Sequence, residues 1–103
     1  MIIVYSKNSV PIRISQERWK HIVDRHPELK DSKEMVVGTI GDPEFILRGD
    51  FGELLAVRFY SKTKMGKKYL VAIYKEAEKT DGFLLTAYLT NKLSEKRSII
   101  WKH

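Results

Sequence analysis

The chain has 103 residues, 43% of them hydrophobic, which predicts a single domain over residues 1–103 with one modest core. Lysine and arginine number 19 against 13 acidic residues, a formal charge of +6, so a polyanion such as RNA is the first class of partner to consider, although an acidic protein would satisfy the same charge. The absence of cysteine excludes disulfides, thiolate zinc sites and a cysteine nucleophile.

The N-terminal residues are apolar, but residues 1–5 are too few for a signal sequence or a membrane span. We therefore expect a soluble, cytoplasmic protein. Ile2–Tyr5 predicts a short strand, and residues 10–14 predict a second extended segment, in which Pro11 favours a position at the edge of a sheet.

Two short helices are predicted next. Ser15 is a suitable N-cap for the first, because its hydroxyl can accept a hydrogen bond from an amide of the first turn, and Pro27 disfavours continuation of that helix. The second helix is expected to begin at Asp31 or Ser32 and to end at Gly-Asp-Pro, residues 41–43.

From residue 44 onward the apolar residues alternate, which is typical of strands. The predicted strands cover residues 45–48, 54–60, 68–75 and 83–90, with turn residues between them. The tail, residues 91–103, mixes basic residues with Ile99, Ile100 and Trp101. We expect this tail to dock on the domain, but its pattern indicates no particular element.

The first helix carries two of the three histidines. At about 100° per residue, His26 falls on the apolar stripe of the helix, whereas His21 and Arg25 lie on the opposite, polar side. An imidazole directed at a sheet can act as a general acid or base. The alternative for His26 is a half-buried residue that caps the helix, and for His21 an exposed residue of the polar face.

The last predicted strand places hydroxyl groups on one face of the sheet. Leu84, Thr86, Tyr88 and Thr90 alternate with Phe83, Leu85, Ala87 and Leu89, so the three hydroxyls stand about 7 Å apart in succession. Such groups can position a phosphate, and tyrosine can stack on a base. Threonine and tyrosine are also good strand formers on a half-solvated face, which is the alternative interpretation.

No phosphate-binding loop, dinucleotide fingerprint, nucleophile elbow or zinc-hydrolase motif occurs in the chain, and we expect no cofactor and no metal. His21, Asp24 and Glu28 would share a helix face and could hold a divalent ion, but Pro27 is expected to end the helix before Glu28, so a solvated charged face explains them better. What remains is chemistry by imidazole, guanidinium, ammonium and hydroxyl groups. These groups suit RNA transesterification to a 2′,3′-cyclic phosphate.

Four segments of the chain resemble, in order, the phage-type branch of the barnase–EndoU–colicin–RelE-like (BECR) nuclease superfamily. They are Arg-Trp-Lys-His-Ile-Val-Asp-Arg-His-Pro-Glu at 18–28, Thr-Ile-Gly-Asp-Pro at 39–43, Tyr-Leu-Val-Ala-Ile-Tyr-Lys at 69–75 and Gly-Phe-Leu-Leu-Thr-Ala-Tyr-Leu-Thr at 82–90. The resemblance implies an α+β fold with N-terminal helices packed on an antiparallel sheet of about four strands, and metal-independent ribonuclease activity. Members of this branch include toxins and phage-delivered effectors.

The resemblance assigns acid–base and phosphate chemistry to His26, Arg25 and His21. It assigns substrate positioning to Thr86, Tyr88 and Thr90, and we add Arg58 because it is a lone charge within a strand. The resulting hypothesis is a toxin-type or mobile-element endoribonuclease that acts on RNA and is held in check by an acidic antitoxin or immunity protein. The alternatives are a catalytically silent RNA-binding domain and a protein-interaction module of the same fold.

Overall fold

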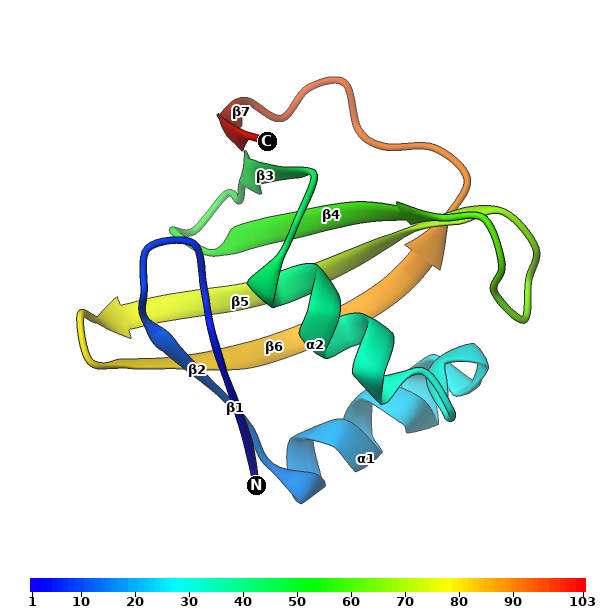
Figure 1. Cartoon of the computed structure of the whole chain (residues 1–103), viewed down its shortest axis with the longest axis horizontal. Coiled ribbons are helices and arrows are strands. Elements are labelled where there is room, and N and C mark those ends of the chain that lie inside the picture. Colours follow the sequence, from blue (N-terminus) through cyan, green and yellow to red (C-terminus); the bar gives the residue numbers. More distant parts are fainter.

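A computed structural model describes all residues from Met1 to His103 and contains seven strands, two α-helices and a short 3-10 helix (Figure 1). In chain order these are β1 (Ile2–Tyr5), β2 (Pro11–Ile14), α1 (Gln16–Arg25), η1 (Pro27–Leu29), α2 (Lys33–Gly41), β3 (Phe45–Arg48), β4 (Leu54–Tyr60), β5 (Lys68–Glu78), β6 (Asp81–Thr90) and β7 (Ile99–Lys102). The molecule measures 35 × 31 × 21 Å along its principal axes. Neither α-helix has both the length and the apolar character that crossing a bilayer requires.

All seven strands belong to one sheet in the order β1-β2-β6-β5-β4-β3-β7. Neighbouring strands are antiparallel except for β2 and β6, which run parallel and pair at Ile12–Gly82 and Arg13–Phe83. The predicted fold, helices packed on an antiparallel sheet of about four strands, is therefore wrong. The domain is mostly sheet, and the sheet has seven strands.

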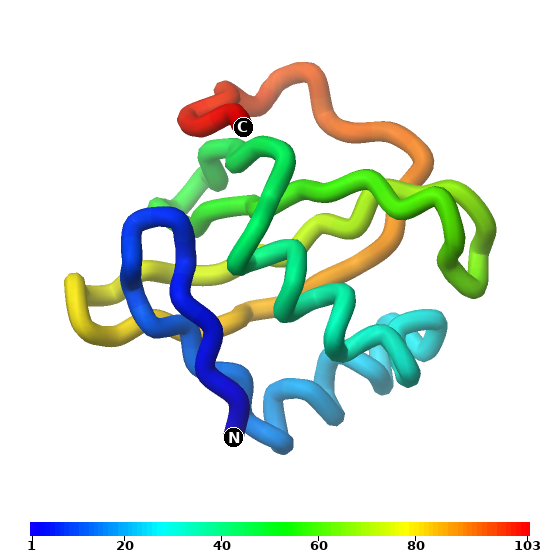
Figure 2. The backbone as a smooth tube through the Cα atoms, viewed as in Figure 1, coloured from blue at the N-terminus to red at the C-terminus, as the bar shows by residue number.

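The physical reason for this difference lies at the two ends of the chain. At one edge, the hairpin of β1 and β2 is added to the sheet by the pairing of β2 with β6. At the other edge, residues 91–98 pass back along the sheet and β7 then pairs with β3 (Figure 2). Pro11 does not mark an edge strand as expected, because β2 lies between β1 and β6.

The helices cover one face of the sheet, and the main core lies between the helices and that face (Figure 1). Helix α1 begins where expected, since the Ser15 hydroxyl accepts a hydrogen bond from the Arg18 amide at 3.0 Å, and it buries Trp19 and Ile22. Strands β5 and β6 contribute Leu70, Ala72, Tyr74, Leu84 and Ala87 to the same core. Burial of this apolar surface is the main favourable contribution to folding.

A smaller apolar cluster occupies the opposite face of the sheet. Its buried members are Leu47, Leu55, Val57 and Val71, and Tyr88 and Leu93 pack against it. No helix covers this face; residues 91–98 cross part of it. The face is therefore the more open side of the sheet.

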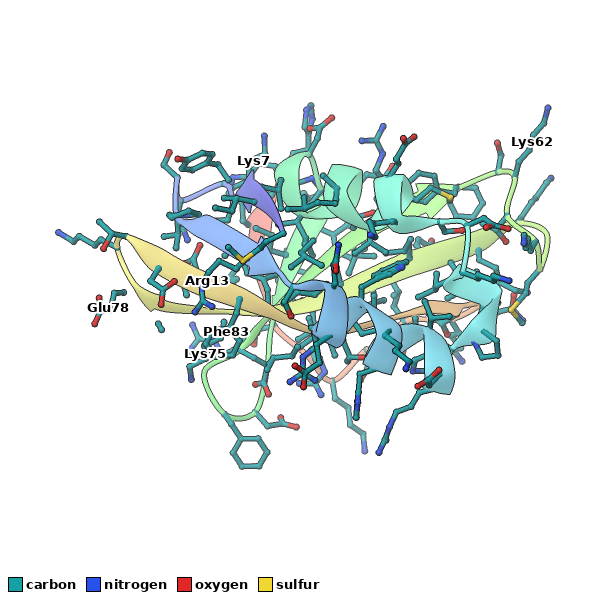
Figure 3. All side chains as sticks on the ribbon, turned by 90° about the horizontal axis from the view of Figure 1, so that it is seen from below. Lys7, Arg13, Lys62, Lys75, Glu78 and Phe83 are labelled. Atoms are coloured by element: carbon teal, nitrogen blue, oxygen red, sulfur yellow. The ribbon has the colours of Figure 1, made fainter.

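Arg13 strengthens the junction of β2 and β6. Its Nε lies 2.7 Å from Asp81 Oδ1. Its guanidinium stands 6.0 Å from the centre of the Phe83 ring, and Figure 3 labels these two residues. The hydrogen bond from Arg13 and its positive charge lower the pKa of the Asp81 carboxyl.

Candidate functional site

The candidate site lies where α1 replaces a strand at the side of β6. Strand β2 pairs with β6 only at Gly82 and Phe83, because the chain turns into α1 after Ile14. Beyond that point α1 runs beside β6, and Arg18 Nη1 donates a hydrogen bond of 3.4 Å to the Leu85 carbonyl. The polar side of the helix is thereby brought next to the hydroxyl-bearing part of β6.

A solvent-open pocket of about 320 Å³ lies between the two elements. Its lining residues are Arg18, His21, Ile22, Arg25, His26, Leu85 and Thr86. Four of the predicted site residues, His21, Arg25, His26 and Thr86, are thus brought together. The pocket combines two imidazoles, two guanidinium groups and a hydroxyl.

His26 occupies the C-cap of α1 and is neither sealed in the core nor fully exposed. About 32% of its side chain is accessible, and Nδ1 lies 3.6 Å from Glu28 Oε2. Its ring stands 6.2 Å from the ring of Tyr88, centre to centre, at an angle of 35°. These contacts hold the imidazole at the rim of the pocket, where it remains accessible to a ligand.

Thr86, Tyr88 and Thr90 share one sheet face, as predicted, and the structure shows that this face is the one opposite the helices. They lie across from Ile73, Val71 and Tyr69 of β5, respectively. The prediction that Leu84 shares this face is wrong, because the register of β5 and β6 shifts between Ile73 and Tyr74 and leaves Leu84 in the main core.

Thr90 lies outside the pocket beside α1. Its hydroxyl donates to the Lys92 carbonyl at 2.9 Å and accepts from the Lys92 amide at 3.3 Å. This hydroxyl therefore stabilises the turn that follows β6. Tyr88 lines a pocket together with Thr90, and its ring also lies next to the ring of His26.

Arg58 is not brought to the pocket. It follows Ala56 on the helix-covered face of β4, and its Nη1 lies 3.1 Å from the Asp42 carbonyl oxygen and 3.2 Å from Asp42 Oδ2. Its guanidinium also stands 5.6 Å from the centre of the Tyr60 ring. The contacts of Arg58 are those of a residue that fastens β4 to the end of α2.

The sequence interpretation did not select several cations that line the hollows on either side of β6. Arg18 lines the pocket beside α1. Arg48, Lys96 and Arg97 line a separate hollow together with Tyr88, here called the tail hollow. Arg97 Nη1 donates to the Arg48 carbonyl at 3.1 Å and also lies 3.3 Å from Asp50 Oδ1. The basic character of the tail was the sequence signal for Lys96 and Arg97. Their position in the tail hollow with Tyr88 depends on the pairing of β7 with β3, which the sequence pattern does not indicate.

The metal alternative is not assembled by the fold. Glu28 lies in η1 and turns to His26 rather than to the helix face of His21 and Asp24. No three side chains among histidine, aspartate and glutamate lie close enough to hold one ion.

The arrangement as a whole offers acid–base groups, fixed positive charge and hydroxyls on one open surface. These are the groups that bind a phosphodiester and stabilise added negative charge on it. Comparison of the chain with protein-family models, with curated proteins and with solved structures found no match.

Proposed function

We propose that the protein is a metal-independent endoribonuclease that cleaves RNA by transesterification and leaves a 2′,3′-cyclic phosphate. The observation that carries the proposal is the pocket between α1 and β6, where His21, His26 and Arg25 converge beside Thr86. The sequence resemblance to the BECR nucleases supports the same activity.

The reaction requires one group to accept a proton and another to donate one. In the proposed mechanism one imidazole takes the proton of the ribose 2′-hydroxyl, and the 2′-oxygen attacks the phosphorus. The other imidazole protonates the departing 5′-oxygen. His26, held beside Glu28 and Tyr88, and His21, five residues earlier in the chain and on the wall of the same pocket, supply these two groups.

The guanidinium groups stabilise the phosphorane. Arg25 and Arg18 both line the pocket, so their charges lie next to the position of the scissile phosphate, where negative charge grows in the transition state. The Thr86 hydroxyl donates to a phosphate oxygen or to the sugar. DNA is not cleaved, because it lacks the 2′-hydroxyl.

An enzyme of this kind acts in the cytoplasm, where its RNA substrates are found, and a chain without cysteine is compatible with that compartment. A toxin-type ribonuclease also requires an inhibitor. The net charge of +6 and the cations around the pocket favour an acidic antitoxin or immunity protein that covers this surface.

A second candidate function is RNA binding without cleavage. It is supported by cations that lie apart from the imidazoles, namely Arg48, Lys96 and Arg97 around the tail hollow. Such a surface binds phosphates whether or not the histidines act.

The deciding experiment compares the wild type with His26→Ala on a structured RNA in the presence of EDTA, with analysis of the product ends. We expect His26→Ala to lower the cleavage rate by about 10²- to 10⁴-fold, the usual effect of removing a general acid or base. His103→Ala is the matched control, since His103 is exposed at the far end of the chain and its ring faces Trp101.

The outcomes separate the candidates. Cyclic phosphate ends produced by the wild type and by His103→Ala, but not by His26→Ala, support the proposed mechanism. Equal cleavage by all three proteins refutes a role for His26. RNA binding by all three proteins without any cleavage leaves only the second candidate.

A further inference from the structure

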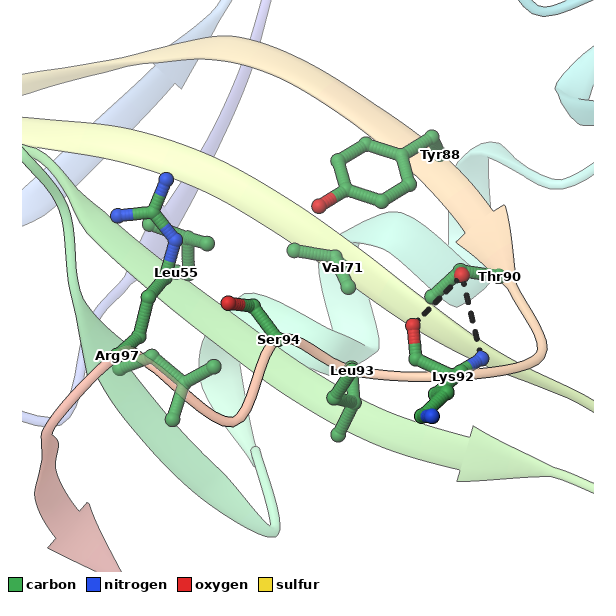
Figure 4. A pocket seen from close by; sticks show the side chains of 9 residues that line it. Leu55, Val71, Tyr88, Thr90, Lys92, Leu93, Ser94 and Arg97 are labelled. Atoms are coloured by element: carbon green, nitrogen blue, oxygen red, sulfur yellow. Dashed lines mark hydrogen bonds between the residues drawn. The ribbon is translucent and has the colours of Figure 1, made fainter.

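A second pocket, of about 360 Å³, lies on the open face of the sheet beside the proposed cleavage site (Figure 4). Strands β3 to β6 form its floor, and residues 91–97 form its outer wall. Its lining residues are Leu47, Leu55, Val71, Tyr88, Thr90, Lys92, Leu93, Ser94 and Arg97.

The chemistry of this pocket changes from floor to rim. The floor is apolar, because Leu47, Leu55 and Val71 belong to the small core cluster of this face. The rim carries hydrogen-bond donors, with the Lys92 ammonium and the Arg97 guanidinium on the outer segment. An apolar slot with an aromatic wall and a donor-rich rim suits a flat heterocycle that bears a phosphate.

The outer wall is fastened along its length. The Thr90 hydroxyl holds the turn at Lys92, and Leu93 packs on the apolar cluster. Arg97 bonds to Asp50 and to the Arg48 carbonyl, and β7 then pairs with β3. The pocket is thus largely formed before any ligand enters, which lowers the entropic cost of binding.

Tyr88 connects this pocket to the cleavage site. One side of the residue faces the His26 ring at 6.2 Å, and its phenol extends across Val71 towards the side of the pocket formed by Ser94 and Arg97 (Figure 4). Thr86, in the cleavage pocket, precedes Tyr88 by two residues on the same strand face, a separation of about 7 Å. One nucleotide can therefore contact both pockets.

We propose that the second pocket binds the base of the nucleotide next to the scissile phosphate, so that the substrate is RNA with an unpaired, unstacked nucleotide at the cleavage position. This inference rests on the proposed ribonuclease function. The base lies on the apolar floor against Tyr88. The Lys92 ammonium at the rim holds the adjoining backbone, while Arg97 stays fastened to Asp50. A base within a duplex cannot enter, because its faces are stacked and its pairing edge is occupied.

The test measures binding of five-nucleotide single strands of 2′-fluoro RNA, which cannot be cleaved because they lack the 2′-hydroxyl. One strand is intact, and each of five others carries a single abasic nucleotide at a different position. Fluorescence anisotropy gives the dissociation constants for the wild type, for Ser94→Trp, which fills the pocket from its exposed wall, and for Thr80→Trp, a control in the distant turn between β5 and β6.

We expect one abasic position to weaken binding to the wild type by about fivefold to a hundredfold, the usual effect of losing one stacked base. Ser94→Trp should bind the intact strand correspondingly more weakly and should lose the dependence on that position, whereas Thr80→Trp should behave as the wild type.

Equal affinity of the wild type for the intact strand and all five abasic strands would overturn the proposal that the second pocket binds a base. The proposed binding of RNA would be unaffected by that result. Retention of the abasic effect in Ser94→Trp would place the base elsewhere and would also overturn the proposal. Failure of the wild type to bind any strand would instead remove the proposed function itself.

Discussion

Tyr74 is a buried residue whose hydroxyl has no hydrogen-bond partner. The side chain is fully buried in the main core, and Oη is the only buried side-chain polar atom without a partner. Burial raises the pKa of the phenol well above its ordinary value, and the negative charge of Glu76 adds to the effect. The structure therefore bears the cost of an unsatisfied polar group at this position.

Replacing Tyr74 by Phe removes that cost while keeping the ring. We expect Tyr74→Phe to raise the free energy of unfolding at pH 7 by about 1 kcal/mol. Urea denaturation followed by circular dichroism measures this change. The exposed Tyr5 provides the control, because Tyr5→Phe should leave the midpoint unchanged. A destabilised Tyr74→Phe protein would show that the hydroxyl has a partner in solution, such as a bound water.

The same residue predicts a pH dependence. In the unfolded chain Tyr74 ionises near pH 10, whereas in the folded protein its raised pKa keeps it protonated. The unfolded state therefore loses this proton first, and the wild type loses stability as the pH rises above about 10, by up to about 1.4 kcal/mol per pH unit from this group. Tyr74→Phe lacks this contribution, so the stability difference between the two proteins should widen from pH 9 to pH 11.

The parallel contact of β2 and β6 depends on a glycine. A Cβ placed on Gly82 would lie 2.6 Å from the Lys75 carbonyl oxygen and 2.6 Å from Ile12 Cδ1. The backbone of β5 cannot move away without disturbing its pairing with β6, so the added methyl group strains the sheet.

We expect Gly82→Ala to destabilise the protein by about 1–3 kcal/mol. Gly38→Ala is the matched substitution in α2, where the nearest atom to the new Cβ would be the Tyr60 hydroxyl oxygen at 3.7 Å, an ordinary contact. There the higher helix propensity of alanine should stabilise the protein by about 0.5–1 kcal/mol. Thermal unfolding of both variants checks the pair, and an unchanged midpoint for Gly82→Ala would contradict the close approach of the strands.

Local elements were predictable because their signals are local. The Ser15 N-cap, the end of the first helix before Pro27 and the strand over residues 54–60 are each confirmed. Strand order was not predictable, since pairing of β2 with β6 joins residues some 70 positions apart. Strand β7 has only four residues, and its conformation is stabilised by β3 rather than by its own pattern.

In the candidate site, too, local features could be predicted from the sequence, whereas features that depend on the tertiary structure could not. Helical periodicity placed His21 and Arg25 on one surface, but the register shift that moves Leu84 into the core leaves no trace in the sequence. Arg58 was selected as a lone charge in a strand, and its contacts with Asp42 arise from the position of α2 over the sheet. Its separation from the pocket is therefore a tertiary property.

On the scale of the whole molecule, cations line both pockets that adjoin Tyr88 and His26. Arg25 lines the pocket beside α1, and Lys92 lines the second pocket, which β3 to β6 and residues 91–97 form and which Tyr88 also lines. Together with the net charge of +6, this distribution favours a nucleic-acid strand that passes over Tyr88 from α1 to the tail. Binding along such a path should release counterions at defined positions.

The salt dependence of RNA binding tests this path. For a single strand, the logarithm of the binding constant falls against the logarithm of salt concentration with a slope of about −0.7 for each phosphate contacted. We expect Arg25→Ala and Lys92→Ala each to reduce the magnitude of this slope by about 0.7, measured by anisotropy with an uncleavable single-stranded RNA between about 50 and 200 mM salt. Lys79→Ala, an exposed charge in the remote turn between β5 and β6, should leave the slope unchanged. If all three substitutions lowered the slope equally, the RNA would be responding to total charge, and no defined path over Tyr88 would exist.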